Sequence, residues 1–195
     1  MALFTTAEVR SAALEAVGTQ SDILTESRAS DHLANESVKQ ASVTHFDIFL
    51  SHAYIDKTIV IGVYSILRNL GFSVYVDWIH DPNLNRNFVT PSTADVLRKR
   101  MRQSDSLMYA TTKSSTSSKW MPWECGLFDG HDGHVAILPV VESSFASYSG
   151  QEYLGLYPIA TKNSYSSGRN QLWIYNQNNM GSSVYFDTWI RGNNP

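Results

Sequence analysis

The sequence has few of the features that secreted, membrane-spanning or nucleic-acid-binding proteins carry. Its only cysteine, Cys125, has no partner for an internal disulfide bond, and its N-terminus lacks the basic and apolar segments of a signal peptide. The longest purely apolar run, Val135–Val141, is too short to cross a bilayer. Charged residues make up 17% of the chain and give a net charge of -3, which leaves no broad basic surface for nucleic acid or anionic lipid. We therefore expect a cytoplasmic protein that binds neither nucleic acid nor membrane.

Several common catalytic motifs are also missing. The chain has neither a Gly-rich phosphate loop of the Walker or Rossmann type nor a Gly-x-Ser-x-Gly nucleophile elbow. Ser51 and His52 are adjacent, but neighbouring side chains on a strand point to opposite faces, which disfavours a serine triad. Residues 131–134 (His-Asp-Gly-His) suit a tight turn, and they offer fewer ligands than zinc needs, so we expect no metal site. The basic residues within 98–102 suit a solvated helix face.

Hydrophobic residues are plentiful, at 43% of 195 residues, so the chain can bury a sizeable core. From residue 46 onward, short apolar strands alternate with amphipathic helices. Alternation of this kind predicts a parallel sheet with right-handed crossovers and a ligand crevice at the carboxyl ends of the strands. The strands are expected at residues 46–50, 72–78, 106–110 and 135–141, and the helices at residues 59–70, 93–103 and 120–128.

The two flanks of this region differ from it in composition. Thr5 and Glu8 form a capping-box pattern, apolar residues then recur at helical spacing, and Gly18 is a typical helix stop. The polar residues 19–43 suit a linker or a second, weaker helix. Residues beyond 143 are rich in Tyr, Ser and Asn, and they suit either a partner surface or loops and edge strands that cover the sheet. We therefore expect an N-terminal helical arm (1–43), a core domain (44–142) and a C-terminal extension (143–195).

Trp120 and Glu124 are spaced at i and i+4 at the start of a predicted helix, so their side chains share one face. An aromatic ring beside a carboxylate suits a ligand with a planar group and a sugar. The commoner interpretation of such a pair is structural, with the Trp in the core and the Glu on the helix surface. Spacing alone favours that structural interpretation.

Three motifs change this balance. Residues 46–52 (Phe-Asp-Ile-Phe-Leu-Ser-His) resemble the first box of Toll/interleukin-1 receptor (TIR) domains, and residues 71–77 resemble their second strand. Residues 120–124 (Trp-Met-Pro-Trp-Glu) resemble the Trp-x-x-x-Glu signature of NAD-cleaving bacterial TIR domains. The resemblance covers about residues 45–142, and residues 150–158 are similar to the extension of the TIR component of Thoeris anti-phage defence systems. It implies a flavodoxin-like three-layer α/β fold with a central parallel sheet in the strand order 2-1-3-4-5.

The same resemblance implies that NAD is a substrate, with no separate cofactor. Nicotinamide leaves a cationic pyridinium as a neutral molecule, so its departure needs no general acid, and one carboxylate can stabilise the oxocarbenium ion that remains. Glu124 is the expected catalytic residue, and Trp120 is expected to line the nicotinamide side of the site. Attack by water, by a group of the same molecule or by a second small molecule gives linear, cyclic or conjugated ADP-ribose, and the sequence leaves these three open.

Four further residues are implied by position to bind the nucleotide. Ser51 and His52 end the first predicted strand, and Asp77 and Trp78 end the second beside the same pocket. Many TIR enzymes have a basic residue after the first box, whereas this chain has residues 53–54 (Ala-Tyr) there, so the basic side chain that could contact a phosphate at that point is missing.

The loop from Asp81 to Arg86 occupies the place of the BB loop, which in TIR domains gates the site and packs between subunits. Arg86 is therefore a candidate for contact with a phosphate or an acidic partner group. The resemblance implies a TIR–TIR homo-oligomer through this loop and a separate effector protein that senses the product.

Two other functions fit the same sequence. A non-catalytic TIR interaction module binds partners through the BB loop and does not need Glu124 beside Trp120. A nucleoside deoxyribosyltransferase-like enzyme also places a carboxylate at a ribose, but it acts on nucleosides without phosphates. Release of nicotinamide from NAD distinguishes the leading hypothesis from both.

Overall fold

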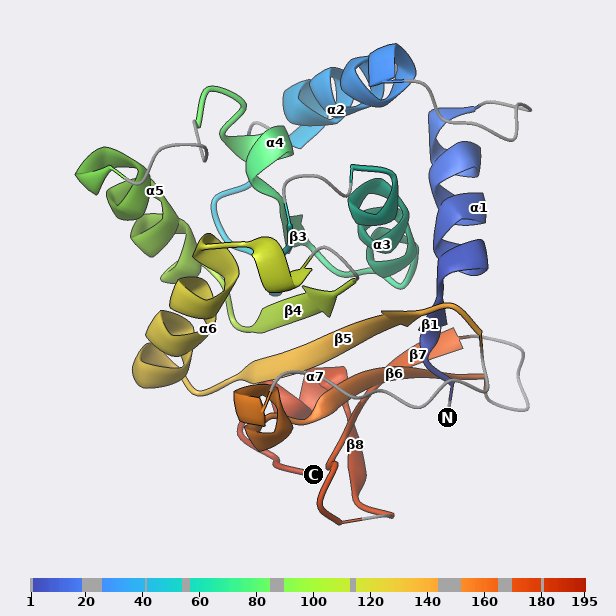
Figure 1. Cartoon of the computed structure of the whole chain (residues 1–195), viewed down its shortest axis with the longest axis vertical. Coiled ribbons are helices and arrows are strands. Elements are labelled where there is room, and N and C mark those ends of the chain that lie inside the picture. Colours follow the sequence, from blue (N-terminus) through green and yellow to red (C-terminus); the bar gives the residue numbers. More distant parts are fainter. Residues whose placement is uncertain are drawn as a thin grey trace.

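A mixed β-sheet lies at the centre of the protein, with helices on both of its faces (Figure 1). The structure is a computed structural model, and it describes residues 2–18, 26–40, 42–53, 57–84, 90–112, 115–143, 152–164, 170–179 and 181–195. Buried apolar side chains form two clusters, one on each face of the sheet. The fold therefore has the three layers that the sequence predicts.

Five parallel strands form the core of the sheet. Along the chain they are β2 (Ile48–Ser51), β3 (Val74–Tyr75), β4 (Leu107–Thr111), β5 (Val135–Val141) and β6 (Ile159–Ser164). Their spatial order is β3-β2-β4-β5-β6, and each neighbouring pair is parallel. Counted from β2 this is the order 2-1-3-4-5, so the predicted flavodoxin-like fold is confirmed. The strand order reverses beside β2, which makes the carboxyl end of β2 the expected place for a ligand.

Helices from the core cover the two faces. On one face lie α3 (Lys57–Asn69) and the short α4 (Asp77–His80), and on the other lie α5 (Pro91–Met101) and α6 (Trp120–His131). Thr90 caps α5 by accepting a hydrogen bond from the Thr93 N–H at 3.2 Å. A single 3-10 turn, Ser115–Ser117, precedes α6. The predicted helices are thus present, with ends that differ by a few residues.

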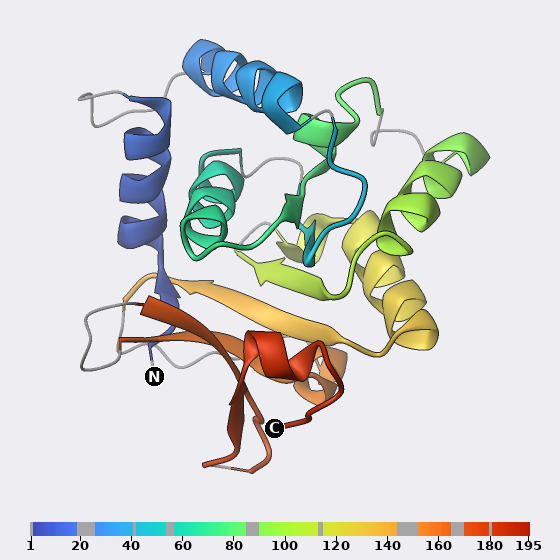
Figure 2. The same cartoon turned by 180° about the vertical axis from the view of Figure 1, so that it is seen from behind.

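The N-terminal arm packs directly on this core. It consists of β1 (Phe4–Thr5), α1 (Thr6–Val17) and α2 (Glu26–Gln40), and β1 pairs in parallel with β5. Thr5 and Gly18 cap α1 as the sequence predicts, with Gly18 in the left-handed conformation. A Cβ atom at Gly62 of α3 would lie 1.9 Å from the Val9 carbonyl oxygen, so only glycine permits this approach of the two helices. Both views show α1 alongside α3 (Figure 2).

The C-terminal extension (143–195) supplies β6 itself and then widens the sheet beyond it. After the 3-10 turn Glu152–Leu156, β6 pairs with β7 (Asn170–Tyr175) and β7 with β8 (Ser183–Tyr185), both antiparallel. From sequence, residues 172–175 and 184–186 suit edge strands; the first range falls on β7, which lies inside the sheet between β6 and β8, and the second overlaps β8 at the end of the sheet. No sequence pattern singles out β6. Residues 186–190 suit either a strand or a helix from sequence, and they begin α7 (Phe186–Trp189). Among the described residues, no helix combines the length and the apolar character needed to cross a bilayer.

One predicted strand is much shorter than expected. Residues 72–78 alternate with period two, yet only Val74 and Tyr75 pair with β2, and the chain then turns into α4. The N–H of Asp81 bonds the Asp77 carbonyl oxygen at 2.8 Å, which closes the helical turn. An acidic residue in a first turn suits a helix N-terminus, and alternation cannot detect this preference. Asp77 and Trp78 therefore lie on a helix rather than at the end of a strand.

Candidate active site

Three elements bring polar side chains to the carboxyl end of β2. Ser51 is the last residue of β2, and His52 follows it. Asp77 opens α4, and Glu124 lies one turn inside α6. Because parallel strands end at one edge of the sheet, helices that follow neighbouring strands converge there. The residues predicted from separate motifs are connected in the structure by direct contacts.

Glu124 forms the closest of these contacts. The Ser51 hydroxyl donates a hydrogen bond to Glu124 Oε2 at 2.6 Å, a length typical of a hydroxyl bonded to a carboxylate. Trp120 lies one turn earlier on α6 and packs edge-on against Trp123, with ring centroids 5.4 Å apart. The hydroxyl at the end of β2 thus fixes the orientation of the carboxyl group on α6.

His52 and Asp77 form a second buried contact beside the first. His52 Nδ1 lies 2.8 Å from the Leu50 carbonyl oxygen, which can only accept, so Nδ1 carries the hydrogen. His52 Nε2 lies 3.2 Å from Asp77 Oδ1, within ion-pair distance but outside hydrogen-bond geometry. Both side chains are only 2% exposed. The Trp78 ring meets the His52 ring edge-on at a centroid distance of 4.7 Å, and the backbone N–H of Trp78 donates to Asp77 Oδ1 at 2.9 Å.

Burial separates the two interpretations of the Trp–Glu pair. Trp120 is 7% exposed, as a core residue is, but Glu124 is 0% exposed and is not the helix-surface charge of the structural interpretation. Because no part of Glu124 is exposed, a ribose reaches its carboxyl group only after neighbouring side chains move. Carboxylates buried in this way are rare unless they have hydrogen-bonding partners, and the Ser51 hydroxyl is one partner of Glu124.

The structure describes only the first part of the predicted BB loop, from Asp81 to Leu84. Arg86 lies outside the described residues, which end at Leu84 and resume at Thr90. Asp81, at the start of the loop, accepts two hydrogen bonds from Arg100, from Nε to Oδ2 at 2.7 Å and from Nη2 to Oδ1 at 3.0 Å. The hydroxyl of buried Tyr75 donates to the same carboxylate at 2.9 Å.

The sequence does not predict these hydrogen bonds from Arg100 and Tyr75 to Asp81 at the end of α4. It expects Arg100 on a solvated helix face, and that prediction is wrong, whereas Arg98 does stay at the surface beside Asp95. The hydrogen bonds to Asp81 raise the pKa of Arg100, and burial raises the pKa of Tyr75. Asp81 directly follows α4 and Arg100 lies on α5, 19 positions further on, so no local sequence pattern signals their contact.

Other reactive side chains have structural surroundings. In the part of the chain that the structure describes, no three His, Cys, Asp or Glu side chains converge as metal ligands. His134 Nδ1 instead lies 2.5 Å from Asp132 Oδ1 within its own turn. Burial raises the pKa of the Cys125 thiol to about 11, which keeps it protonated and unreactive near neutral pH.

These features define a class of protein. A central sheet in the order 2-1-3-4-5, with the carboxylate of a Trp-x-x-x-Glu motif bonded to the end of its first strand, is the arrangement expected of a TIR domain.

Comparison with known proteins supports this assignment. No protein-family profile matches the chain. The chain is 45% identical over 150 residues to a Bacillus cereus (strain MSX-D12) protein named "Probable 3' cyclic ADP-D-ribose synthase ThsB'", which covers 76% of this chain and 77% of that protein. It is also 34% identical over 80 residues to the "Putative cyclic ADP-D-ribose synthase TIR2" of Cytobacillus dafuensis, covering 40% of this chain and 21% of that protein. The chain belongs to the ThsB' family of TIR-domain proteins.

Proposed function

We propose that this protein cleaves the bond between nicotinamide and ribose in NAD and closes the remaining ADP-ribose into a cyclic signal nucleotide, in defence against phage. The names of both relatives, as cyclic ADP-D-ribose synthases, support this proposal. The observation that carries it is the buried Glu124 carboxyl, oriented by the Ser51 hydroxyl at the carboxyl end of β2.

The proposed reaction needs little from the protein beyond one charge and a closed site. The C1′–N bond breaks, and its electron pair leaves with nicotinamide, which becomes neutral. The ribose is left as an oxocarbenium ion, and the Glu124 carboxylate stabilises that positive charge. A nucleophile of the adenosine half attacks C1′ and loses its proton to solvent, which completes the cyclic product.

Burial of the site supports cyclisation over hydrolysis. Glu124 has no exposed surface and Trp120 is only 7% exposed, so the side chains around them would exclude water from the cation once they close again around bound NAD. The nucleophile carried by the same molecule then has little competition. The same burial implies that the resting protein is closed and turns over slowly until an activating event opens the site.

The remaining predicted residues have supporting roles in this proposal. His52, Asp77 and Trp78 are proposed to hold the nucleotide, because the first two are buried in contact beside the carboxyl. Arg86 is proposed to meet a phosphate or an acidic group of a second copy. We infer a homo-oligomer through the loop from Asp81 to Arg86, a separate effector that senses the product, and a place in the cytoplasm, where NAD is available.

The proposal is tested by incubating the full chain with NAD, with and without extract from phage-infected cells, and measuring nicotinamide. Glu124→Ala is expected to lower the release rate by about 10²–10³, as loss of an electrostatic transition-state contact does. Glu152→Gln, an exposed carboxylate on another segment, is the matched control and should match the wild type. Mass analysis of the second product separates cyclic from linear or conjugated ADP-ribose.

Equal release by the wild type and Glu124→Ala would show that the carboxylate is not catalytic. Cleavage of deoxynucleosides without cleavage of NAD would favour the deoxyribosyltransferase-like alternative. A protein that binds another TIR domain and leaves NAD intact under both conditions would be the non-catalytic interaction module.

A further inference from the structure

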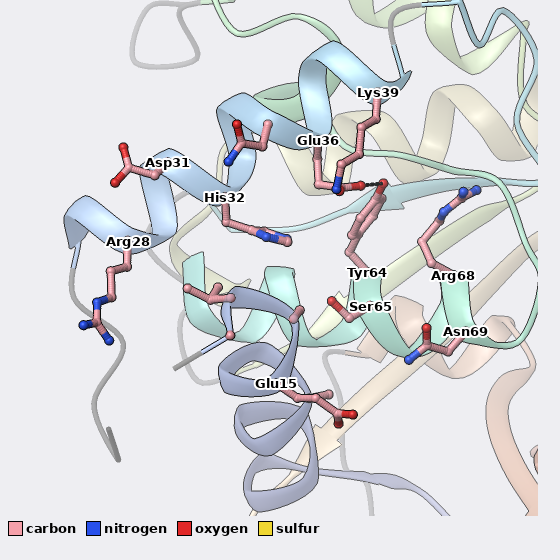
Figure 3. A pocket seen from close by; sticks show the side chains of 15 residues that line it. Glu15, Arg28, Asp31, His32, Glu36, Lys39, Tyr64, Ser65, Arg68 and Asn69 are labelled. Carbon is pink, nitrogen blue, oxygen red and sulfur yellow. Dashed lines mark hydrogen bonds and ion pairs between the residues drawn. The ribbon is translucent and has the colours of Figure 1, made fainter. Parts of the chain in front are cut away.

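An open polar cavity of about 910 Å³ lies between α1, α2 and α3, away from Glu124; we call it the arm cavity. Helix α1 lines it with Glu15, α2 with His32 and Lys39, and α3 with Arg68 (Figure 3). None of these side chains belongs to the proposed NAD site. The N-terminal arm therefore does more than cover the core, because it completes a second concave surface.

A hydrogen-bonded group closes one wall of the arm cavity. Lys39 Nζ lies 2.8 Å from Glu36 Oε1, and the Tyr64 hydroxyl donates to Glu36 Oε2 at 3.1 Å. Burial raises the pKa of Tyr64, so its hydroxyl remains a donor. The charge of Glu36 is therefore already matched, and this group holds α2 against α3 rather than offering a free charge to a ligand.

The part of α3 that follows Tyr64 has hydrogen-bonding capacity that no described residue uses. Arg68 donates only from Nη1, to the Phe72 carbonyl oxygen at 3.2 Å, so the rest of its planar fork has no partner within the described residues. Ser65 and Asn69 share that face of α3 and make no side-chain hydrogen bond in the described part of the chain. Across from them, the Glu15 carboxylate of α1 makes no ion pair with any described residue. These groups are left to water or to a ligand.

Arg28 and Asp31 also line the arm cavity, but in Figure 3 they lie at the end away from Arg68, so the signs of Arg68 and Glu15 select the ligand. A carboxylate matches the fork of Arg68 in two parallel hydrogen bonds, but a purely anionic molecule would also lie near Glu15. A cation would bind Glu15 and be repelled by Arg68. In Figure 3, Asn69 lies between Arg68 and Glu15, so neutral donors and acceptors separate the two charges. We propose that the arm cavity binds a zwitterionic amino acid or short peptide, with its carboxylate at Arg68 and its ammonium at Glu15.

The arm cavity is linked through α2 to α4, the helix that carries Asp77 and Trp78. Helix α2 packs against α4, and Ala29 and Leu33 of α2 share one apolar cluster with Ile79 of α4. The proposed ligand bridges Arg68 of α3 and Glu15 of α1, and both of these helices pack against α2, which in turn contacts α4. We infer that the bound molecule is an effector of the NAD site, a step that rests on the proposed function.

Binding is tested by nuclear magnetic resonance on the ¹⁵N-labelled full chain, with trialanine and a mixture of the standard amino acids as probes. Saturable shifts are expected in the Arg68 Nε–H and Asn69 amide signals with at least one probe. Tighter binding of trialanine would indicate a peptide ligand, and tighter binding from the mixture would indicate a free amino acid. Propionate and ethylamine, which carry one charge each, should bind about tenfold more weakly or less.

Glu15→Gln removes an exposed charge that pairs with no described residue, so the variant should fold normally and bind the probe about tenfold more weakly. Arg68→Gln should weaken binding in the same way, and Arg98→Gln on α5 is the matched control that should bind as the wild type does. Absence of saturable shifts with both probes, equal binding by the single-charge molecules, or unchanged affinity of Glu15→Gln would each overturn the site.

The effector step has a readout that does not require NAD cleavage. The indole N–H signal of Trp78 should move with the same saturation curve as the Asn69 amide. A Trp78 signal that stays fixed while the arm cavity saturates would overturn the effector step. Failure of the proposed function shows separately, as NAD left intact by a protein that still binds the probe.

Discussion

The Glu124 site and the arm cavity differ in how many of their polar groups are hydrogen-bonded or paired with other residues of the protein. At the end of β2, Glu124 is fully buried and bonded to Ser51. In the arm cavity, Arg68 and Glu15 keep bonding capacity that no described residue uses. A satisfied, buried carboxylate suits a reaction that excludes water, whereas an open cavity with free charges suits reversible binding. Closure thus marks the proposed reaction site, and openness marks the proposed effector site.

The largest expected effect comes from separating the arm from the core. In Gly62→Ala, the new Cβ would lie 1.9 Å from the Val9 carbonyl oxygen, so α1 must shift away from α3 and change the wall that it gives to the arm cavity. The free energy of unfolding, measured with urea, should fall by about 1–3 kcal/mol.

The matched control for this change is Gly126→Ala in α6, where a Cβ meets no atom within 4 Å. Its free energy of unfolding should stay equal or rise by about 0.5–1 kcal/mol, since alanine favours a helix interior. If Gly62→Ala is as stable as the wild type, the close packing of α1 on α3 is wrong.

A smaller effect is expected at the closed region. Ser51→Ala removes the donor at 2.6 Å from Glu124 and leaves a buried carboxyl with one hydrogen bond fewer. Urea unfolding should show a loss of about 1–2 kcal/mol. Ser11→Ala, at an exposed position of α1, is the control and should be neutral. An unchanged midpoint for Ser51→Ala would argue against the bond to Glu124.

The smallest effect is a pH dependence on the open side. Burial lowers the pKa of His32 below its ordinary value of about 6.5. The negative charge of Glu36 partly offsets this shift, and the positive charge of Lys39 adds to it. The unfolded chain then binds this proton at higher pH than the folded one, so the free energy of unfolding falls as the pH drops below about 7. His32→Gln should flatten this fall, and a slope identical to that of the wild type would contradict it.

The sequence predicts most of the fold because apolar periodicity reports burial directly. The all-apolar run Val135–Val141 is the central strand β5, and the caps at Thr5 and Gly18 mark the ends of α1. Strand β6 was not predicted, since its residues Ile159–Ser164 mix polar and apolar types without a clear period. The sequence does not predict the start of α4, because residues 72–78 alternate as a strand does. Only Val74 and Tyr75 in that range pair with β2.

The sequence predicts which residues form the candidate site, but it does not predict that Glu124 is fully buried there. Spacing places Glu124 and Trp120 on one face of α6, and motif order brings Ser51 to the same edge of the sheet. Burial of Glu124 depends on how α6 packs against the end of β2, which no local pattern records. The arm cavity depends on contacts among three helices far apart in sequence, and for the same reason it could not be predicted.

The central claim is that the charge of Glu124 stabilises a cation formed from NAD. Glu124→Gln keeps the size of the side chain and an oxygen that accepts from Ser51, so it isolates that charge. The most direct measurement is the single-turnover rate of nicotinamide release by activated Glu124→Gln, together with its affinity for NAD. The account predicts a rate about 10²–10³ lower with the affinity nearly unchanged. A wild-type rate in Glu124→Gln would contradict it.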